Sequence, residues 1–214
     1  ALHRMGVTKP IILGHSWGTL VALELALQDQ QDTAALVLVS GYYVPTPRAD
    51  VPVMAMPSLP IGGDLLSVTL WPLAARATAE AALRKVFAPA PVPDRFRRGF
   101  PVELAVRPSQ LRAGAAEAAM MIPAATGMVQ RAQAQRLPIV VIAGDGDRVV
   151  STDQQSAQLE AHAPGSGFIR LPGVGHMAHH TAPDQVAAAV ERLAHILWPE
   201  EAFPVRQPEP VPPL

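Results

Sequence analysis

The chain has 214 residues, of which 49% are hydrophobic and 16% charged, and its formal net charge is −1. This length suits one domain with a sizeable core, and the near-zero charge argues against nucleic acid or anionic lipid as a partner. The sequence contains no cysteine, which excludes disulfides, thiolate metal sites and a cysteine nucleophile. No apolar run reaches the roughly 18 residues of a membrane span, and no signal peptide is recognisable, so a cytoplasmic location is the default expectation.

The first forty residues alternate between helical and strand patterns. ALHRMG predicts a helical turn that ends at Gly6, a glycine able to take positive φ. The apolar run PIIL at residues 10–13 is typical of a buried parallel strand. Strong helix formers with an apolar face then predict a helix from Trp17 to about Gln28. The run ALVLVS predicts a second buried strand at 35–40.

The segment from Tyr42 to about Gln135 has a different character. It contains 12 prolines, which exclude long regular strands, and we expect short helices at 74–87 and 110–121. This segment is long for a loop within a compact sheet, so we predict an inserted helical subdomain. Its cluster of basic residues is interpreted as a solvated helix face rather than an anion site: Arg95, Arg97 and Arg98.

The strand pattern resumes after the insertion. We expect strands at 138–144 and 167–171, a helix at about 152–162 capped by Ser151 or Thr152, and a final helix at 183–197. Strands that alternate with helices predict an α/β fold with a mostly parallel sheet and flanking helices. The expected organisation is a core of residues 1–41 and 136–197, a helical insertion at 42–135, and an extended proline-rich tail at 198–214.

The pentapeptide GHSWG at residues 14–18 lies between the first predicted strand and helix. A G-x-S-x-G sequence at such a junction is typical of a sharp turn that exposes a nucleophilic serine, here Ser16. The start of the following helix also directs unpaired N–H groups toward developing negative charge. The alternative is a Gly-Ser turn without chemistry, and the strand and helix patterns around it favour the nucleophile.

A serine nucleophile needs a base, and the sequence offers seven histidines. We favour His176, because it follows a predicted strand and a glycine-rich turn. His179 and His180 follow at metal-ligand spacing, but we disfavour a metal because cysteine is absent and only Asp184 is near to complete a site. His15 is expected to shape the pocket wall. The remaining histidines are expected at the surface: His3, His162 and His195.

The base in turn needs an acceptor that orients it. The sequence GDGD follows the predicted strand at 138–144, and it offers Asp145 and Asp147. We favour Asp147, which lies at the tip of the loop, and interpret Asp145 as a turn former that bonds its own backbone. The alternative for both residues is a turn without a catalytic role.

Ser16, Asp147 and His176 thus each follow a predicted strand, and the carboxyl ends of parallel strands are where open α/β sheets bind ligands. GHSWG, GDGDRVV at 144–150 and GVGHM at 173–177 resemble, in this order, the motifs of the α/β-hydrolase fold family, and the chain is similar to its capped serine esterase and lipase-like members. The resemblance implies that the insertion is a cap over the pocket, that the Trp17 N–H binds an oxyanion, and that no cofactor or metal is needed. It also implies that His15 and Met177 contact the substrate.

The sequence departs from the family pattern at its N-terminal end. It has no His-Gly dipeptide to mark the second oxyanion donor, and about four strands and one helix of the usual core have no counterpart before Ser16. The resemblance therefore implies that the strand at 10–13 has an unpaired edge, which invites self-association.

The expected function is a serine hydrolase that cleaves a carboxylic ester of a small to medium apolar molecule through an acyl-enzyme. The alternatives are a C–C bond hydrolase or peptidase with the same triad, and a non-catalytic binding protein or inactive fragment with this fold.

Overall fold

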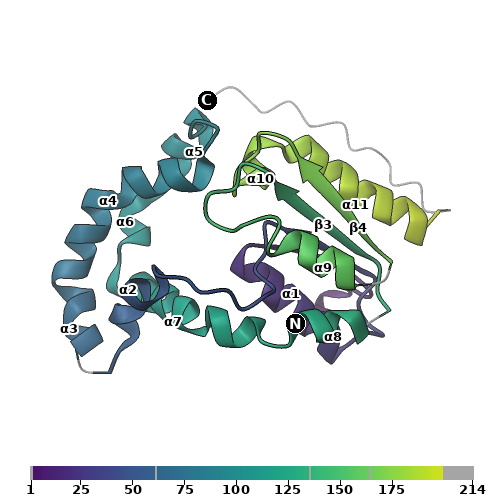
Figure 1. Ribbon diagram of the computed structural model, residues 1–214, viewed down its shortest axis with the longest axis horizontal. Coiled ribbons are helices and arrows are strands. Elements are labelled where there is room, and N and C mark those ends of the chain that lie inside the picture. Colours follow the sequence, from purple (N-terminus) through teal and green to yellow (C-terminus); the bar gives the residue numbers. More distant parts are fainter. Residues whose placement is uncertain (1, 61, 135, 164, 200–214) are drawn as a thin grey trace.

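The computed structural model describes residues 2–60, 62–134, 136–163 and 165–199 (Figure 1). Its centre is a four-stranded parallel sheet in the order β1-β2-β3-β4, so neighbours in the chain are neighbours in space. This confirms the predicted α/β class with a parallel sheet. The strands are β1 (Ile11–His15), β2 (Ala35–Val39), β3 (Ile139–Gly144) and β4 (Ser166–Leu171).

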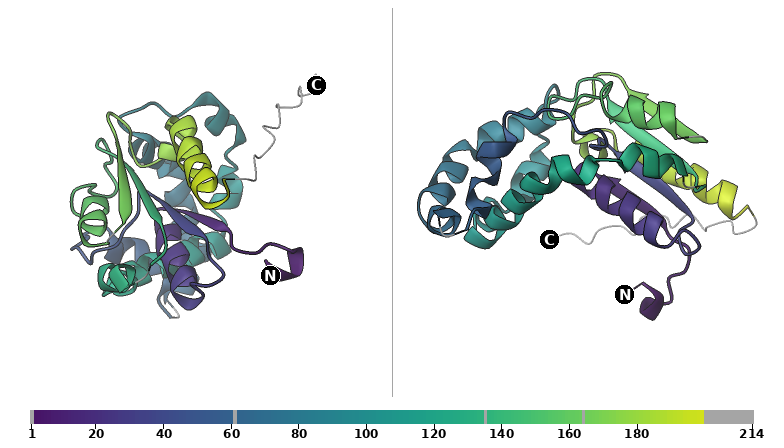
Figure 2. Two further views of the ribbon diagram at one scale, coloured as in Figure 1. Left: turned by 90° about the vertical axis from the view of Figure 1, so that its right-hand side faces the viewer. Right: turned by 60° about the horizontal axis from the view of Figure 1, so that its bottom comes forward.

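Helices cover both faces of the sheet (Figures 1 and 2). On one face α1, α8 and α9 pack on Leu36 and Leu38 of β2, and on the other α10 and α11 pack on Val37 and Val39. Successive β2 residues therefore point to opposite apolar layers, which explains why this strand is apolar throughout. The flanking helices are α1 (Trp17–Gln28), α8 (Met128–Ala134), α9 (Ser156–His162), α10 (Ala178–Thr181) and α11 (Pro183–Leu197).

The insertion between β2 and β3 is helical and extends to one side of the sheet (Figure 1). Its entry is held by the buried side chain of Gln155, whose Oε1 accepts the N–H groups of Tyr43 and Val44, both at 2.7 Å. We propose that these helices form a cap and that the cap ends before α8, because Met128 and Ala132 of α8 belong to the core layer under the sheet. The elements of the insertion are α2 (Val51–Ala55), η2 (Met56–Ser58), α3 (Gly62–Val68), α4 (Leu70–Phe87), α5 (Asp94–Gly99), α6 (Val102–Ala105) and α7 (Pro108–Ala125).

The structure confirms one predicted helix end and contradicts one predicted helix cap. Gly6 has φ 76° and ends the short helix η1 (His3–Met5), as predicted. The predicted cap of α9 is wrong. This helix starts at Ser156, and the Thr152 hydroxyl instead donates to the Gly144 carbonyl at 2.5 Å. Most of the proline-rich tail, residues 200–214, lies outside the described residues.

Strand β1 lies at the edge of the described sheet, with β2 as its one neighbour. By the alternation of a parallel ladder, the backbone groups of Ile11, Leu13 and His15 point away from β2. The Leu13 side chain is 45% exposed. This is the open edge that the sequence predicts, although the strand runs to His15 rather than Leu13.

None of the described helices is by itself both long and apolar enough to cross a membrane, whereas the bent pair 51–58 and 62–68 satisfies length and composition together.

Candidate active site

Ser16 occupies the turn between β1 and α1. Its backbone has φ 52° and ψ −122°, a conformation that costs a non-glycine residue about 1–3 kcal/mol. Two bonds hold this turn: the Ser16 N–H donates to the Val39 carbonyl at 2.9 Å, and the Thr19 hydroxyl donates to the Ser16 carbonyl at 2.6 Å. A Cβ at Gly14 would lie 2.4 Å from the Gly18 carbonyl oxygen, so only glycine fits there. The Ser16 side chain makes no helix-cap bond, which leaves its hydroxyl available for other partners.

His176 lies in the loop between β4 and α10 and is 4% exposed. Its Nε2 is 2.9 Å from Ser16 Oγ, although 160 residues separate the two in the chain. The preceding Gly175 packs so closely on the insertion that a Cβ there would lie 2.0 Å from the Ala88 carbonyl oxygen. The end of α4 therefore lies against the backbone that carries His176.

Asp147 completes a hydrogen-bonded row of three side chains, Ser16, His176 and Asp147. Its side chain is fully buried, and its Oδ2 lies 2.8 Å from His176 Nδ1. Its Oδ1 accepts the N–H groups of Val149 at 2.7 Å and Val150 at 2.9 Å, which fixes the orientation of the carboxylate. Because a carboxylate only accepts hydrogen bonds, Nδ1 carries the imidazole proton and Nε2 is left to accept the Ser16 hydroxyl.

Asp145 points elsewhere. Its Oδ1 accepts the Gly173 N–H at 2.6 Å, which joins the loop after β3 to the turn before His176. It thus bonds backbone, as the sequence suggested, but the backbone belongs to a segment 28 residues away rather than to its own turn.

Two further histidines pack beside His176. The His15 Nε2 donates to the His176 carbonyl at 2.9 Å, and the His15 and His179 ring centroids are 4.2 Å apart. Burial lowers the pKa of His15 to about 4 and that of His179 to about 4, so both rings are neutral at pH 7. His15 therefore supports the backbone of His176.

The described residues offer a metal one group of three ligands, at the exposed His3 and Asp29 and the half-buried Asp32, and this group does not include His179 or His180. The neutral rings of His15 and His179 instead pack against each other next to His176.

The remaining predicted contacts are Trp17 and Met177. Trp17 is the first residue of α1, and within the described chain its N–H donates to no protein group. It is therefore free to bind a substrate oxygen next to Ser16. Met177 is half-buried, and its carbonyl accepts the N–H groups of His180 and Thr181 at the start of α10.

Two cavities lie near these residues. One, of about 490 Å³, is bounded by α5, α10 and the start of α11 and has His179 in its wall. The other, of about 350 Å³, extends along α1 from Trp17 to Gln28 and faces α7. Ser16 lines neither cavity, and the second cavity leads away from Ser16 along α1. Sequence analysis interpreted Arg95, which lines the first cavity, as part of a solvated helix face and did not single out Phe96 or Phe100, because nothing local distinguishes these residues from others on a surface helix.

The chain is an α/β protein with polar side chains gathered at the carboxyl ends of its parallel strands, where open sheets bind ligands. The profile of the Alpha/beta hydrolase family matches residues 1–189, and the chain belongs to this family. Comparison with curated protein sequences gives no match.

Solved structures of this fold are similar at low sequence identity. An alpha/beta hydrolase fold protein from Burkholderia ambifaria has a TM-score of 0.71 and 21% identity over 88% of this chain and 67% of its own. An esterase from Exiguobacterium antarcticum has a TM-score of 0.67 and 14% identity over 90% and 69% of the two chains. The 2-hydroxy-6-oxo-6-phenylhexa-2,4-dienoate hydrolase of Rhodococcus sp. strain RHA1 has a TM-score of 0.63 and 17% identity over 90% and 66%. These chains share the fold, and the present chain spans about two thirds of their length.

Proposed function

We propose that the protein is a serine hydrolase that cleaves carboxylic esters of small to medium apolar molecules. The observation that carries this proposal is the continuous row Ser16 Oγ–His176 Nε2 at 2.9 Å and His176 Nδ1–Asp147 Oδ2 at 2.8 Å. A serine hydroxyl becomes a useful nucleophile when a base accepts its proton and a carboxylate holds that base in the correct tautomer.

In the proposed mechanism Ser16 Oγ attacks the ester carbonyl while His176 Nε2 takes the hydroxyl proton. The imidazolium that forms is stabilised by the buried Asp147 carboxylate, and it then gives its proton to the departing alcohol. Water, activated by the same imidazole, hydrolyses the acyl-enzyme and restores the serine. The Trp17 N–H is the proposed donor to the oxyanion at both stages, and one such donor contributes about 10²–10³ in rate.

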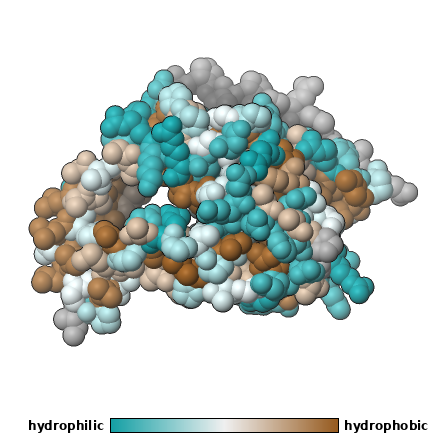
Figure 3. Space-filling view, in the orientation of Figure 1, coloured by the Kyte–Doolittle hydropathy of each residue, from teal (hydrophilic) through white to brown (hydrophobic). Residues whose placement is uncertain are grey.

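The composition of the insertion supports an apolar substrate. Exposed apolar side chains are spread over its helices, where Figure 3 shows a largely hydrophobic surface. They include Met54, Leu59, Leu65, Leu73, Leu104 and Met120. As a cap, these helices would present apolar groups to a substrate that approaches Ser16.

Alternative reactions use the same row. A C–C bond hydrolase is favoured to some degree by the similarity to the Rhodococcus dienoate hydrolase, and a peptidase needs no different residues. A non-catalytic binding protein is the alternative from another class, and it predicts that Ser16 is not activated.

Covalent labelling separates these two classes. A fluorophosphonate probe should label the wild-type chain within minutes, and Ser16→Ala should abolish labelling because the nucleophile is removed. Ser151→Ala, which changes an exposed serine, is the matched control. Labelling that persists in Ser16→Ala, or a wild-type chain that stays unlabelled, would overturn the proposal. Hydrolysis of 4-nitrophenyl butyrate then tests the ester preference.

A further inference from the structure

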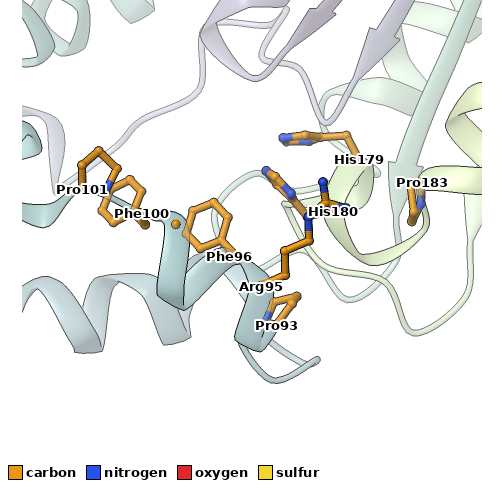
Figure 4. A pocket seen from close by; sticks show the side chains of 9 residues that line it. Pro93, Arg95, Phe96, Phe100, Pro101, His179, His180 and Pro183 are labelled. Carbon is orange, nitrogen blue, oxygen red and sulfur yellow. The ribbon is translucent and has the colours of Figure 1, made fainter. Parts of the chain in front are cut away.

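The cavity of about 490 Å³ lies between the insertion and the core. Its insertion side is formed by α5 and the turn after it, and its core side by α10 and the first residue of α11. Figure 4 shows Arg95 extending from α5 toward His179 and His180, with the Phe96 and Phe100 rings beside it.

This cavity adjoins the candidate catalytic row. His179 in its wall packs on His15, and His15 in turn lies 5.0 Å from the His176 ring, centroid to centroid, and donates to the His176 carbonyl. Two imidazole rings, those of His179 and His15, therefore lie between the cavity and the His176 ring.

The cavity wall carries a positive charge that no carboxylate of the wall balances. Arg95 is the one arginine or lysine that lines it, and no aspartate or glutamate does. Within the described chain no carboxylate forms an ion pair with Arg95, whereas the neighbouring Arg97 pairs with Glu80 at 2.6 Å. Asp94 and Asp184 are adjacent in sequence to lining residues, but neither lines the cavity. Arg95, Arg97 and Arg98 are all exposed, as the prediction of a solvated face requires, and Arg95 differs from Arg97 in lining the cavity without an ion-pair partner among the described residues.

The imidazoles of His179 and His180 add hydrogen-bonding groups to the cavity wall. His179 Nδ1 is buried and has no partner among the described residues. Burial keeps the His179 ring neutral, and because Nδ1 is closed to solvent, Nε2 is the ring nitrogen left to bond a molecule in the cavity. A planar anion would satisfy the guanidinium of Arg95, and an imidazole N–H would add a second donor.

The rest of the wall is apolar, with two aromatic rings among prolines and a glycine. The Phe96 and Phe100 rings stack with centroids 5.2 Å apart, and His180 meets Phe96 edge-on at 4.9 Å. Such a surface suits a flat apolar body next to the charged group.

We propose that this cavity binds a carboxylate attached to an aromatic or other flat apolar group, and that Arg95 determines this specificity. The inference rests on the proposed function, because it assigns the cavity to the substrate of Ser16. The substrate is then an ester that carries a second, free carboxylate on its apolar end.

Phenylacetate and its neutral analogue phenylacetamide are suitable probes, measured by isothermal titration calorimetry on the Ser16→Ala chain. Phenylacetate should bind more tightly than phenylacetamide. Arg95→Gln should weaken phenylacetate binding about tenfold and leave the amide unchanged, and Arg95→Lys should recover part of the loss. Arg98→Gln, on the same helix but outside the cavity wall, is the matched control and should change neither affinity. Equal affinity for the two probes, or an Arg95→Gln variant that binds phenylacetate normally, would overturn the proposal.

A second measurement ties the cavity to Ser16. In the wild-type chain phenylacetate should inhibit hydrolysis of 4-nitrophenyl butyrate competitively, and binding without competition would overturn the assignment of the cavity to the substrate. Failure of the proposed function gives a different pattern, since the fluorophosphonate probe would then not label Ser16 whatever phenylacetate does.

Discussion

Replacing Asp147 by Asn tests the proposed mechanism most sharply. Oδ1 of Asp147 accepts two backbone N–H groups, from Val149 and Val150. In the Asn variant the amide oxygen must stay at this position, because the amide NH₂ would place a donor against two donors. The NH₂ group then faces His176 Nδ1, which must become an acceptor. His176 Nε2 consequently carries the proton and cannot take the one from Ser16.

The expected loss follows from this change of tautomer. A Ser-His-Asp row that keeps its geometry but holds the wrong tautomer loses about 10⁴ in turnover, or about 5.5 kcal/mol of transition-state stabilisation. Asp145→Asn is the matched control, because an Asn oxygen can still accept the Gly173 N–H. Its effect should stay within about 0.5 kcal/mol, as for other exposed positions.

The second-order rate of fluorophosphonate labelling measures both variants without knowledge of the substrate. Circular dichroism at increasing temperature should show that both variants are folded at the assay temperature. If folded Asp147→Asn labels at more than a tenth of the wild-type rate, or if Asp145→Asn is the slower variant, the assigned role of Asp147 is wrong.

Three further changes test other parts of the structure. Gly175→Ala should slow fluorophosphonate labelling at least tenfold, because its Cβ would lie 2.0 Å from the Ala88 carbonyl oxygen. Gly167→Ala is the control and should not slow labelling, because no atom lies within 4 Å of its Cβ. Equal rates for the two variants would show that the insertion can move away from Gly175 without effect on the site. Because burial lowers the pKa of His15 from 6.5 to about 4, the unfolded chain binds a proton between these pH values that the folded chain does not. The free energy of unfolding of the wild-type chain should therefore fall by up to about 3 kcal/mol as the pH drops to 4. Urea unfolding at pH 7 and 4.5 should show that His15→Gln loses less stability over this range than the wild-type chain. We predict that the chain self-associates through the open edge of β1 and that Leu13→Lys, a charge on this strand, reduces the association measured by sedimentation; a monomeric wild-type chain, or association that Leu13→Lys does not change, would contradict this.

The positions of the strands along the chain and of the candidate nucleophile could be predicted because their signals are local. The run at 35–40 is apolar without alternation, as a strand buried on both faces requires, and β2 is buried throughout. Ser16 was found for a similar reason, since Gly14 before it has no room for a Cβ. The run at 10–13 was also expected to be buried, and this was wrong, because β1 is an edge strand whose Leu13 is 45% exposed. The helix starts were less certain, and α9 begins later than expected because the Thr152 hydroxyl bonds the end of β3 instead of capping a helix.

The choice between neighbouring polar residues was harder. Asp145 and Asp147 follow the same strand, and either could in principle turn toward the imidazole. The structure separates them by their partners: Asp147 reaches His176, and Asp145 reaches the Gly173 amide. A sequence pattern contains no information on which carboxylate faces across the sheet edge, so the preference for Asp147 rested on position alone.

By itself the sequence determined the α/β class, the strand–turn–helix that presents Ser16, and the loops that carry Asp147 and His176, because propensity, apolar runs and glycine requirements act over a few residues. Only the tertiary structure decided that Ala88 lies against Gly175 and that Arg95 faces His179 in a shared cavity. These contacts join segments more than eighty residues apart, and they depend on how the inserted helices pack on the sheet, which no local pattern encodes.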